Sequence, residues 1–355
     1  MLAASKPIAF LHGRPGPHPM HGAFARAVGA SFHPVDFAAR WHDIPLPAAI
    51  RYWRWAWNAF RFPYRRYRAV LVEGPHVWPP FGGKAWGVPT FSLLDNETLY
   101  FLQAGFYNKW VRWGLLQAIR RYDVLLVIGE MQAQLAHRLL GRRCPPVYVG
   151  FNGVAEERLE ALGKLRPSLE APIILFIGHG GASWRTYYKG LDLFVEVMAC
   201  LRAHLPEVEG WVVGRWAEAE QEALLRRYPE APVRFLGPAE QIQGILGQAA
   251  LYFHPGRGEA YGIAVLEAMA AGVPALVSEW TGAREVVQRV WPEGVIPLSA
   301  QGMTQAILRY FALPVAERRA IGERGRTLVH THYTASQAIQ RFQAIFHQAL
   351  AACEA

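Results

Sequence analysis

Two glutamates in the stretch GEAYGIAVLEAMAAGVPALVSEWTGAREVV, residues 258 to 287, have a spacing that could do chemistry. Glu259 lies in a glycine-flanked turn, and Glu267 lies about one turn inside the helix that the following residues predict. The first turn of a helix carries unpaired backbone N–H groups and the positive end of the helix dipole, which together suit an anion such as a diphosphate. Both carboxylates can therefore face one ligand bound at this end of the helix.

The residues around the two glutamates predict how such a ligand would be held. Gly262 would let the backbone approach closely, so that the amides of Gly262, Ile263 and Ala264 cradle a phosphate. Glu267 would bind the paired hydroxyls of a ribose, because an ionised acceptor makes the stronger hydrogen bonds. Glu259 would then lie over a sugar.

An amphipathic core helix is the alternative interpretation, since Leu266 and Met269 are apolar and Glu267 could be a solvated acid. The flanking sequence favours a ligand site. The apolar runs ALYFHP, residues 250 to 255, and PALVS, residues 274 to 278, predict a strand on each side of the helix. The glutamates then lie at the carboxyl end of a strand, where open α/β sheets bind ligands.

Matching segments in the same order along most of residues 120 to 350 relate the chain to a known family. It resembles the retaining glycosyltransferases of family 4, whose E-x7-E signature corresponds to EAYGIAVLE in this sequence. The other matching segments are VYVGFNGV (147 to 154), KGLDLF (189 to 194), WVVG (211 to 214), VRFLGP (233 to 238), EAMAAGVPALVS and GAREVV. These motifs are specific for the family rather than for a substrate.

The resemblance implies an α/β chain of the GT-B fold, with two facing Rossmann-like, doubly wound domains and a C-terminal helix that crosses back to the first. We expect an acceptor-binding domain over residues 1–165, a nucleotide-sugar-binding domain over 166–335 and the returning helix over 336–355. The implied activity is transfer of a hexose from a UDP- or GDP-sugar to a glycan, a lipid-linked molecule or another hydroxyl acceptor, with retention of anomeric configuration. Such a hexosyltransferase falls in the EC 2.4 class.

Departure of a nucleoside diphosphate is the demanding step of this reaction, and positive groups at the phosphates lower its barrier. The resemblance makes Lys189, in the matching KG element, the first candidate for that role and Arg185 the second. It also places Tyr261 and Gly214 beside the donor. Family members usually have an arginine directly after the glycine of the preceding strand, whereas this chain has Gly-His at 178–179. Both basic residues could alternatively be solvated loop charges.

The loop after the first predicted strand, GRPGPHPMH, resembles the glycine-rich acceptor loop of the family. Gly16, His18 and His21 would face the acceptor, although His18 could equally be a surface histidine. In LLDNE, residues 93 to 97, Leu94 stands before Asp95 where many relatives have a histidine. That difference leaves this position without an assigned catalytic role.

No Asp-x-Asp pair occurs in the sequence, so the carboxylates expected of a metal-dependent glycosyltransferase are missing. We therefore expect a metal-independent enzyme that needs no cofactor beyond its nucleotide-sugar substrate. The three cysteines, Cys144, Cys200 and Cys353, are far apart and have neither metal-ligand nor disulfide spacing. A reducing, cytoplasmic location fits this pattern.

The net charge of +9 at pH 7 predicts attraction to polyanions, which include nucleic acid, anionic lipid and phosphorylated substrates. No helix-turn-helix, RNP or zinc pattern supports nucleic acid as the partner. With 355 residues, of which 52% are hydrophobic and 18% charged, the chain is long and apolar enough for two globular domains. A non-catalytic binding protein of the same fold and a sugar-nucleotide epimerase remain as alternative functions.

Continuous apolar runs predict parallel strands that are buried on both faces. In the first half they occur at residues 7–13, 68–74, 89–94 and 123–129. After a linker at 162–172, a second series begins with IILFIGHG and runs to VIPL at 295–298. The last stretch predicts a helix whose apolar face carries Ala338, Phe342, Ile345 and Phe346.

Residues 51–68, RYWRWAWNAFRFPYRRYR, are unusually rich in basic and aromatic side chains. Helical spacing before Pro63 places Arg51, Arg54 and Arg61 on one face and Trp53, Ala56 and Phe60 roughly opposite. Such a segment suits an anionic membrane surface, which would make the enzyme peripheral at the inner face of the membrane. The alternative is a helix that packs its tryptophans into the first domain. No segment has the roughly 20 apolar residues of a spanning helix, and the N-terminal apolar run predicts a strand rather than a signal peptide.

Overall fold

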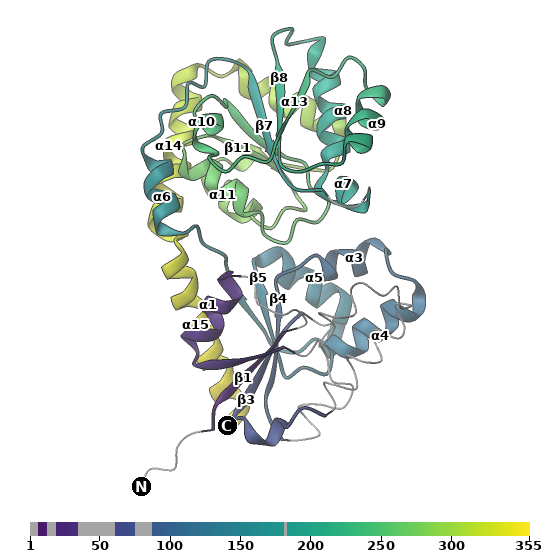
Figure 1. Ribbon diagram of the computed structural model, residues 1–355, viewed down its shortest axis with the longest axis vertical. Helices are drawn as coiled ribbons and strands as arrows, with labels where there is room; N and C mark the ends of the chain where they lie inside the picture. The colour runs from purple at the N-terminus through teal and green to yellow at the C-terminus, as the bar shows by residue number, and fades with distance from the viewer. Residues whose placement is uncertain (1–5, 13–18, 35–60, 75–86, 181–182) are drawn as a thin grey trace. The chain divides into compact units, whose positions relative to one another are not determined.

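The computed structural model describes residues 6–12, 19–34, 61–74, 87–180 and 183–355. The chain forms two compact units, one made of Met1–Phe151 with Gln337–Ala355 and the other of Asn152–Ser336. Each unit is a parallel sheet with helices on both faces (Figure 1). The predicted α/β fold with two Rossmann-like domains is therefore confirmed.

The sheet of the first unit has six strands in the order β2-β1-β3-β4-β5-β6, and all neighbouring pairs are parallel. The strands are β1 (Ile8–His12), β2 (Ala30–Pro34), β3 (Ala69–Glu73), β4 (Thr90–Leu94), β5 (Val124–Ile128) and β6 (Val147–Gly150). The apolar runs predicted as strands are β1, β3, β4 and β5, and every residue of β1, β4 and β5 is buried. The edge strand β2 is half-exposed, and its sequence ASFHP has no such run.

Helices cover both faces of this sheet (Figure 1). They are α1 (Pro19–Ala27), α3 (Thr98–Ala104), α4 (Lys109–Ile119), α5 (Glu130–Leu140) and α15 (Ala335–Glu354). The predicted C-terminal helix is confirmed, because α15 returns to the first unit and buries the four expected apolar residues. Phe342 stacks on Phe24 of α1 with ring centroids 4.4 Å apart, and Phe346 lies 4.7 Å from Phe91 of β4.

The sheet of the second unit also has six parallel strands, in the order β12-β11-β10-β7-β8-β9. They are β7 (Ile173–Ile177), β8 (Glu209–Val213), β9 (Val233–Gly237), β10 (Leu251–His254), β11 (Ala275–Ser278) and β12 (Val295–Ile296). The first three strands run outward from β7 in one direction, and the last three run outward in the other. The order therefore reverses between β7 and β10, as in dinucleotide-binding sheets.

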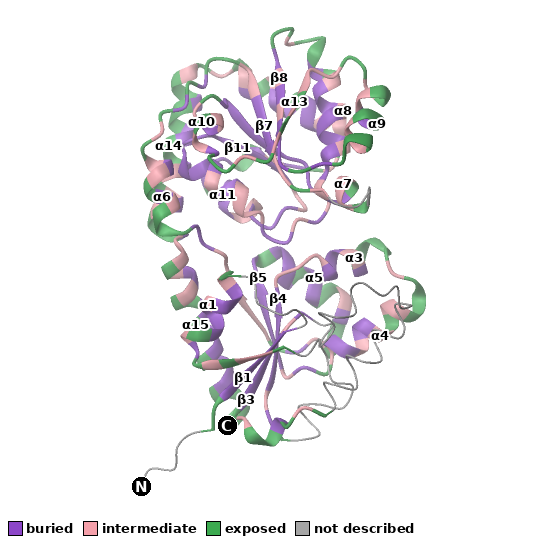
Figure 2. Ribbon diagram, in the orientation of Figure 1, coloured by how far each residue is buried: buried purple, intermediate pink, exposed green. Residues whose placement is uncertain are grey.

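The helices of the second unit cover both sheet faces, and their outer sides are exposed (Figure 2). They are α6 (Glu156–Gly163), α7 (Ser183–Lys189), α8 (Leu191–Arg202), α9 (Glu218–Arg227), α10 (Gln243–Leu246), α11 (Ile263–Ala270), α12 (Arg284–Val290), α13 (Ala300–Ala312) and α14 (Val315–His332). Helix α8 packs on α13, whereas α11 packs on α14 and α6.

The boundary between the units lies earlier than the predicted boundary after residue 165. Residues 152–165 belong to the second unit, because α6 packs on α11 and Val154 pairs with Thr334, just after α14. The amide of Val154 donates to the carbonyl of Tyr333 at 2.9 Å, and Ala335 donates to Val154 at 2.8 Å. The chain returns to the first unit at Gln337, one residue after the predicted position.

The basic aromatic segment at 51–68 is only partly visible, since residues 51–60 lie outside the described residues. The visible part packs on the first unit. Tyr64 is buried, Phe62 stacks on Tyr67 with centroids 5.1 Å apart, and His33 of β2 contacts both of these rings. Among the described helices, none combines the length and the apolar character that crossing a membrane requires.

Candidate active site

The topological switch point of the second unit brings two loops together. Strands β7 and β10 are neighbours, but the chain leaves them toward opposite ends of the sheet. Such a point forms a crevice beyond the carboxyl ends of the strands, where doubly wound sheets bind ligands. Helix α7 follows β7 here, and the turn from Pro255 to Gly262 connects β10 to α11.

An ion pair between Lys189 and Glu259 joins these two loops. The lysine Nζ donates to Glu259 Oε2, and the two side chains are only 15% and 12% exposed. His254, the last residue of β10, lies on the same carboxylate oxygen, with Nε2 3.4 Å away. Burial by itself would raise the pKa of Glu259, but the charge of Lys189 and the hydrogen bond from His254 outweigh it and hold that pKa well below its usual range. Glu259 is therefore ionised throughout the physiological range.

The turn that carries Glu259 is fixed by Arg257. Its guanidinium binds both carboxylate oxygens of Asp192 in α8, at 2.7 and 3.0 Å, and also donates to the carbonyl of Tyr187 at 2.7 Å. Its backbone amide donates to Tyr188 O at 2.8 Å. Gly190 has φ +77° and packs so closely that a Cβ there would overlap the carbonyl oxygen of Pro255. These contacts hold Lys189 and Glu259 in one rigid frame.

The N-terminus of α11 offers backbone donors beside this ion pair. Gly262 caps the helix with φ +91°, and the amide of Val265 already donates to its carbonyl at 2.9 Å. Within the described part of the chain, the amides of Gly262, Ile263 and Ala264 have no backbone acceptor. All three residues are half-exposed, so these amides are open to an anion.

Tyr261, expected beside the donor, is buried, with 2% of its surface exposed. Burial, followed by the charge of Glu285, raises its pKa well above the usual value. Its carbonyl accepts from the amide of Ala283 at 2.6 Å, which ties the turn to the loop before α12. The structure gives this residue a packing role.

Glu267 is not a freely solvated acid. Arg158 of α6 donates to Glu267 Oε1 at 2.9 Å, and the two side chains are 28% and 18% exposed. Both site glutamates also act on the buried Tyr252, whose pKa is raised by burial and further by the charges of Glu259 and Glu267. The carboxylates thus converge on one region, although α11 is at the same time a core helix whose Leu266 is fully buried.

Arg185 and Gly214 occupy the neighbouring loops. Arg185 lies one turn before Lys189 in α7, and its Nε is buried with no hydrogen-bond partner within the described ranges. Gly214 follows β8 with φ +127°, and a Cβ there would overlap the carbonyl oxygen of Gly178. His179 stands where the family usually has arginine, and its Nδ1 accepts from the amide of Arg215 at 3.1 Å. The histidine thus fixes the loop after β7, while the Arg185 guanidinium lies 5.7 Å from the centroid of the Trp184 ring.

The first unit carries a second charged cluster, again at a switch point. Its strand order reverses between β1 and β3, which end in His12 and Glu73, and Asp95 directly follows β4. His21 of α1 contacts both acids, with Nδ1 2.6 Å from Glu73 and Nε2 on Asp95, while His12 contacts the other Glu73 oxygen. Both histidines are 3% exposed.

Of the expected acceptor-side residues, His21 lies in this charged cluster, whereas Gly16 and His18 lie outside the described residues. Sequence reasoning missed His12 and Glu73 here, and His254, Arg257 and Arg158 in the second unit. The available signal was position, because His12, Glu73 and His254 each lie within one residue of the end of a predicted apolar run and end the observed strand.

Three members of the cluster could in principle hold a metal ion. His21, Glu73 and Asp95 offer ligand atoms within 4.8 Å of one another, and no other such group occurs among the residues that the structure describes. Hydrogen bonding between His21 and the two carboxylates accounts for the same arrangement without a metal. Metal independence stays a prediction.

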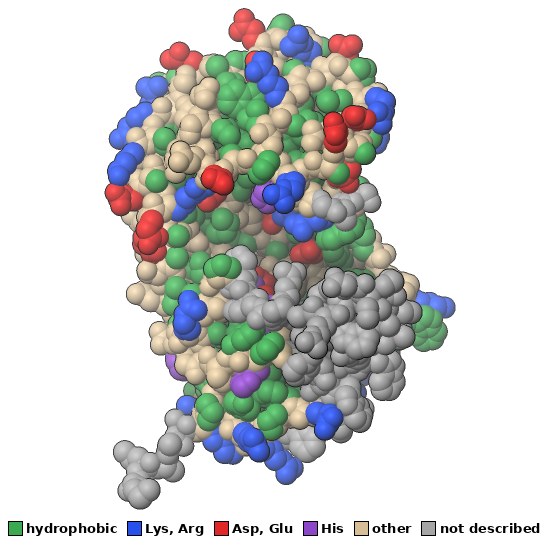
Figure 3. Space-filling view, viewed as in Figure 1, with side chains coloured by type: hydrophobic (Ala, Val, Ile, Leu, Met, Phe, Trp, Pro, Cys, Tyr) green, Lys and Arg blue, Asp and Glu red, His purple; other side chains and the backbone are tan. Residues whose placement is uncertain are grey.

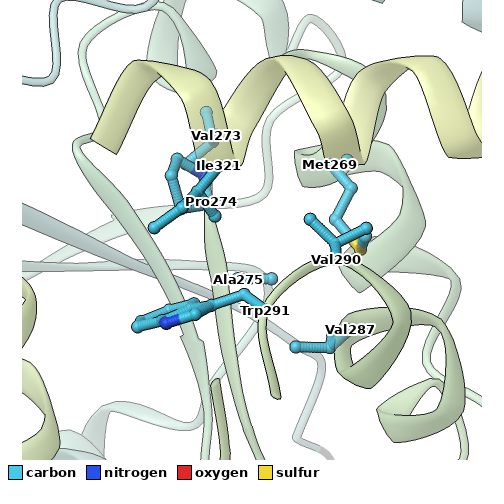
Figure 4. A pocket seen from close by; sticks show the side chains of 9 residues that line it. Met269, Val273, Pro274, Ala275, Val287, Val290, Trp291 and Ile321 are labelled. Carbon is cyan, nitrogen blue, oxygen red and sulfur yellow. The ribbon is translucent and has the colours of Figure 1, made fainter. Parts of the chain in front are cut away.

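A small void near α11 belongs to the core rather than to this site. Its volume is about 10 Å³, which is at most the space of one water. Figure 4 shows that the side chains of Met269, Val290, Trp291 and Ile321 line it, so it is an apolar gap under α14. The candidate site is therefore defined by its charges and open amides.

Part of the second unit is similar to a known family of proteins. Residues 171–312 match the family model described as Glycosyl transferases group 1, and this range contains the Lys189–Glu259 pair and α11. A phosphatidyl-myo-inositol mannosyltransferase from Propionibacterium freudenreichii subsp. shermanii is 28% identical over 221 residues, which are 60% of this chain and 53% of that protein. The chain thus spans about half the length of this curated relative.

Solved structures with similar coordinates support the fold. Sucrose-phosphate synthase from Thermosynechococcus elongatus superposes with a TM-score of 0.70 at 18% identity, covering 98% of this chain and 100% of the other. HepE from Anabaena, in complex with UDP and glucose, gives a TM-score of 0.68 at 15% identity, covering 97% and 100%. The chain therefore has the GT-B fold, and residues 171–312 of its second unit are similar to the glycosyl transferases group 1 model.

Proposed function

We propose that the chain is a retaining glycosyltransferase of family 4 that transfers a hexose from a UDP- or GDP-sugar to a hydroxyl acceptor. The observation that carries this proposal is the buried Lys189–Glu259 pair beside the open amides of α11, at the switch point of the second unit. It lies inside the region that matches the glycosyltransferase family model. Names of relatives, including the mannosyltransferase and the structure with bound UDP and glucose, support a nucleotide-sugar donor.

Each group of the site has a part in the proposed reaction. The bond between the anomeric carbon and the diphosphate oxygen breaks, and negative charge builds on the departing phosphate. Lys189 and the amides at Gly262 to Ala264 stabilise that charge, which is the kind of preorganised electrostatic help that lowers such barriers most. Arg185 adds a second positive charge from α7. Because these groups carry the charge, the reaction proceeds without a metal ion.

The carboxylates orient the donor. Glu259 is ionised and held from two sides, so it can accept hydrogen bonds from sugar hydroxyls at a fixed position. Glu267, held by Arg158, binds the ribose hydroxyls of the nucleotide. The acceptor hydroxyl bonds to the same face of the sugar that the diphosphate leaves, and the phosphate takes up its proton.

The acceptor is a glycan or a lipid-linked molecule bound by the first unit, where the His21 cluster supplies buried polar groups. The name of one relative, an amylovoran biosynthesis glycosyltransferase from Erwinia amylovora, supports a glycan acceptor, and that of the mannosyltransferase supports a lipid. We place the enzyme in the cytoplasm, peripheral to the inner face of the membrane.

Thermal-shift screening with UDP, GDP, ADP and their sugars tests donor binding, because a ligand that binds only the folded state raises apparent stability. The nucleotide-sugar that raises the melting temperature is then incubated with candidate acceptors. The anomeric configuration of the product is determined by NMR. Transfer with retention supports the proposal. Binding without turnover would indicate a non-catalytic binding protein, and conversion of one sugar nucleotide into its epimer would indicate an epimerase. An unchanged melting temperature with every nucleotide and nucleotide-sugar would refute the proposed enzyme activity.

A further inference from the structure

Two tryptophans on α4 are unusually exposed for a large apolar side chain. Trp110 is 73% and Trp113 is 63% exposed, which are the highest values among the large hydrophobic residues of the described chain. Phe106, in the connection just before the helix, is 44% exposed. Tryptophan is normally well buried in soluble proteins, so adjacent exposed rings indicate an interaction surface.

The geometry of α4 presents these rings together on a firm support. Trp110 and Trp113 are three residues apart, which places them on the same side of a helix. Asn108 caps the helix by accepting from the amides of Trp110 and Val111 at 3.1 and 3.0 Å. The opposite side is anchored in the first unit, where Leu115, Leu116, Ala118 and Ile119 are buried. The outer face is therefore exposed on a well-packed helix.

The surroundings of the two rings are basic. From Thr98 to Tyr122 the sequence contains Lys109, Arg112, Arg120 and Arg121 and no aspartate or glutamate. The Nζ of Lys109 lies 5.4 Å from the centroid of the Trp110 ring. Figure 3 shows basic and hydrophobic side chains together at the edge of the first unit where Figure 1 places α4, and Figure 2 shows the connection from α3 to α4 as exposed.

We propose that the α4 surface, made of Phe106, Lys109, Trp110 and Trp113, docks the protein on an anionic lipid bilayer. Tryptophan rings favour the interfacial zone of a membrane, and basic side chains nearby are attracted to anionic headgroups. This surface is distinct from residues 51–68. The proposal rests on the peripheral membrane location in the proposed function and gives it a surface; vesicle binding and sugar transfer are measured separately, so either can fail alone.

Two other occupants fit the surface less well. A symmetric dimer through α4 would place Lys109 and its basic neighbours against the same charges of a second copy, which is unfavourable. Single-stranded nucleic acid is bound by aromatic rings that line a basic groove, whereas Trp110 and Trp113 project from the convex face of a helix.

Co-sedimentation of the full chain with vesicles tests the proposal. We expect binding to vesicles of equal parts phosphatidylglycerol and phosphatidylcholine, much weaker binding to phosphatidylcholine alone, and loss of binding as salt rises from about 0.1 M to about 1 M. Trp110→Ser/Trp113→Ser should weaken binding roughly tenfold or more, because both interfacial rings are removed. Lys109→Gln should weaken it about fivefold, the equivalent of about 1 kcal/mol per basic residue.

The second unit provides matched controls. Trp184→Ser removes another partly exposed tryptophan, and Arg226→Gln removes an exposed charge; both should bind vesicles like the wild type.

Equal binding of wild type and the double tryptophan variant, or no binding of the wild type to anionic vesicles, would overturn the proposal. A fall in molar mass of the tryptophan variant in light scattering would show a dimer interface instead, and tight oligonucleotide binding without vesicle binding would show a nucleic-acid surface. Because the rings are exposed, the variant should fold, and the single variant Trp110→Ser serves if it does not.

Discussion

Replacing Lys189 with methionine separates the structural role of the ion pair from its chemical role. Methionine keeps the length of the side chain but removes the charge that balances Glu259. Removing one partner of a buried ion pair typically costs about 3–5 kcal/mol, because the other charge stays buried without compensation. Both side chains are 12–15% exposed, so we expect a loss near the lower end, about 3 kcal/mol.

A second substitution tests whether the lost stability comes from the uncompensated charge of Glu259. The double variant Lys189→Met/Glu259→Gln has no buried charge left uncompensated, so it should regain most of the lost stability. Turnover should not return, since the charge at the departing phosphate is still missing. We expect both variants to turn over about 100 to 1000 times more slowly than the wild type, as when one transition-state charge stabiliser is removed.

The effect of pH has a defined sign. In the wild type, folding lowers the pKa of Glu259. The ionised carboxylate therefore stabilises the fold fully above the pKa of the unfolded chain, about 4.3, and this stabilisation is lost as the pH falls below that value. In Lys189→Met the largest contribution that lowers this pKa is lost while burial and His254 remain, so the pKa rises and the ionised carboxylate stabilises the fold less at neutral pH. The stability difference between wild type and variant should therefore shrink as pH falls from 7 to about 4.

Chemical denaturation of the three proteins at both pH values, with steady-state kinetics at neutral pH, measures these effects. The reasoning is refuted if the double variant is no more stable than Lys189→Met, or if it recovers turnover together with stability. The first outcome would mean that the pair is not electrostatically coupled, and the second that the charge of Lys189 only balances Glu259 and has no part in the chemistry.

Two further predictions concern single residues of the second unit, and one concerns metal ions. Arg158→Gln should weaken nucleoside diphosphate binding about fivefold in calorimetry, because Glu267 loses the hydrogen bond that orients it; unchanged affinity would show that Glu267 needs no support. Gly214→Ala should cost at least about 1 kcal/mol in thermal unfolding, since its φ of +127° is strained for alanine, whereas Gly244→Ala, with open space around it, should be neutral or stabilising. Dialysis against EDTA should leave turnover unchanged, and activity restored by added divalent metal would contradict metal independence.

Local sequence patterns predicted the two α/β units and, in the first unit, four of the six strands. A strand buried on both faces must be apolar along its whole length, so β1, β4 and β5 are visible in the sequence alone. The half-exposed β2 has no such pattern, and it was missed. The turn and helix around Glu259 were likewise predictable, because glycine and an amphipathic run are local signals.

The partners of the site residues were not predictable in this way. Arg158 and Glu267 are 109 positions apart, and Lys189 and Glu259 are 70 apart. Which side chains meet depends on which strands lie side by side, and hydrophobic periodicity reports burial without reporting strand order. The same limit explains why the His21 cluster, drawn from four separate segments, was recognised at only one position.

The central claim is that the second unit binds a nucleotide-sugar through α11 and its two glutamates, and titration calorimetry with UDP and GDP tests it most directly. We predict that one of the two binds the wild type at a single site, and that Glu267→Ala weakens this binding by about 1.5–3 kcal/mol, the range for hydrogen bonds to a charged group. Glu293→Ala, which removes an exposed acid elsewhere in the unit, should bind like the wild type. Absence of binding by both nucleotides, or unchanged affinity in Glu267→Ala, would contradict the claim.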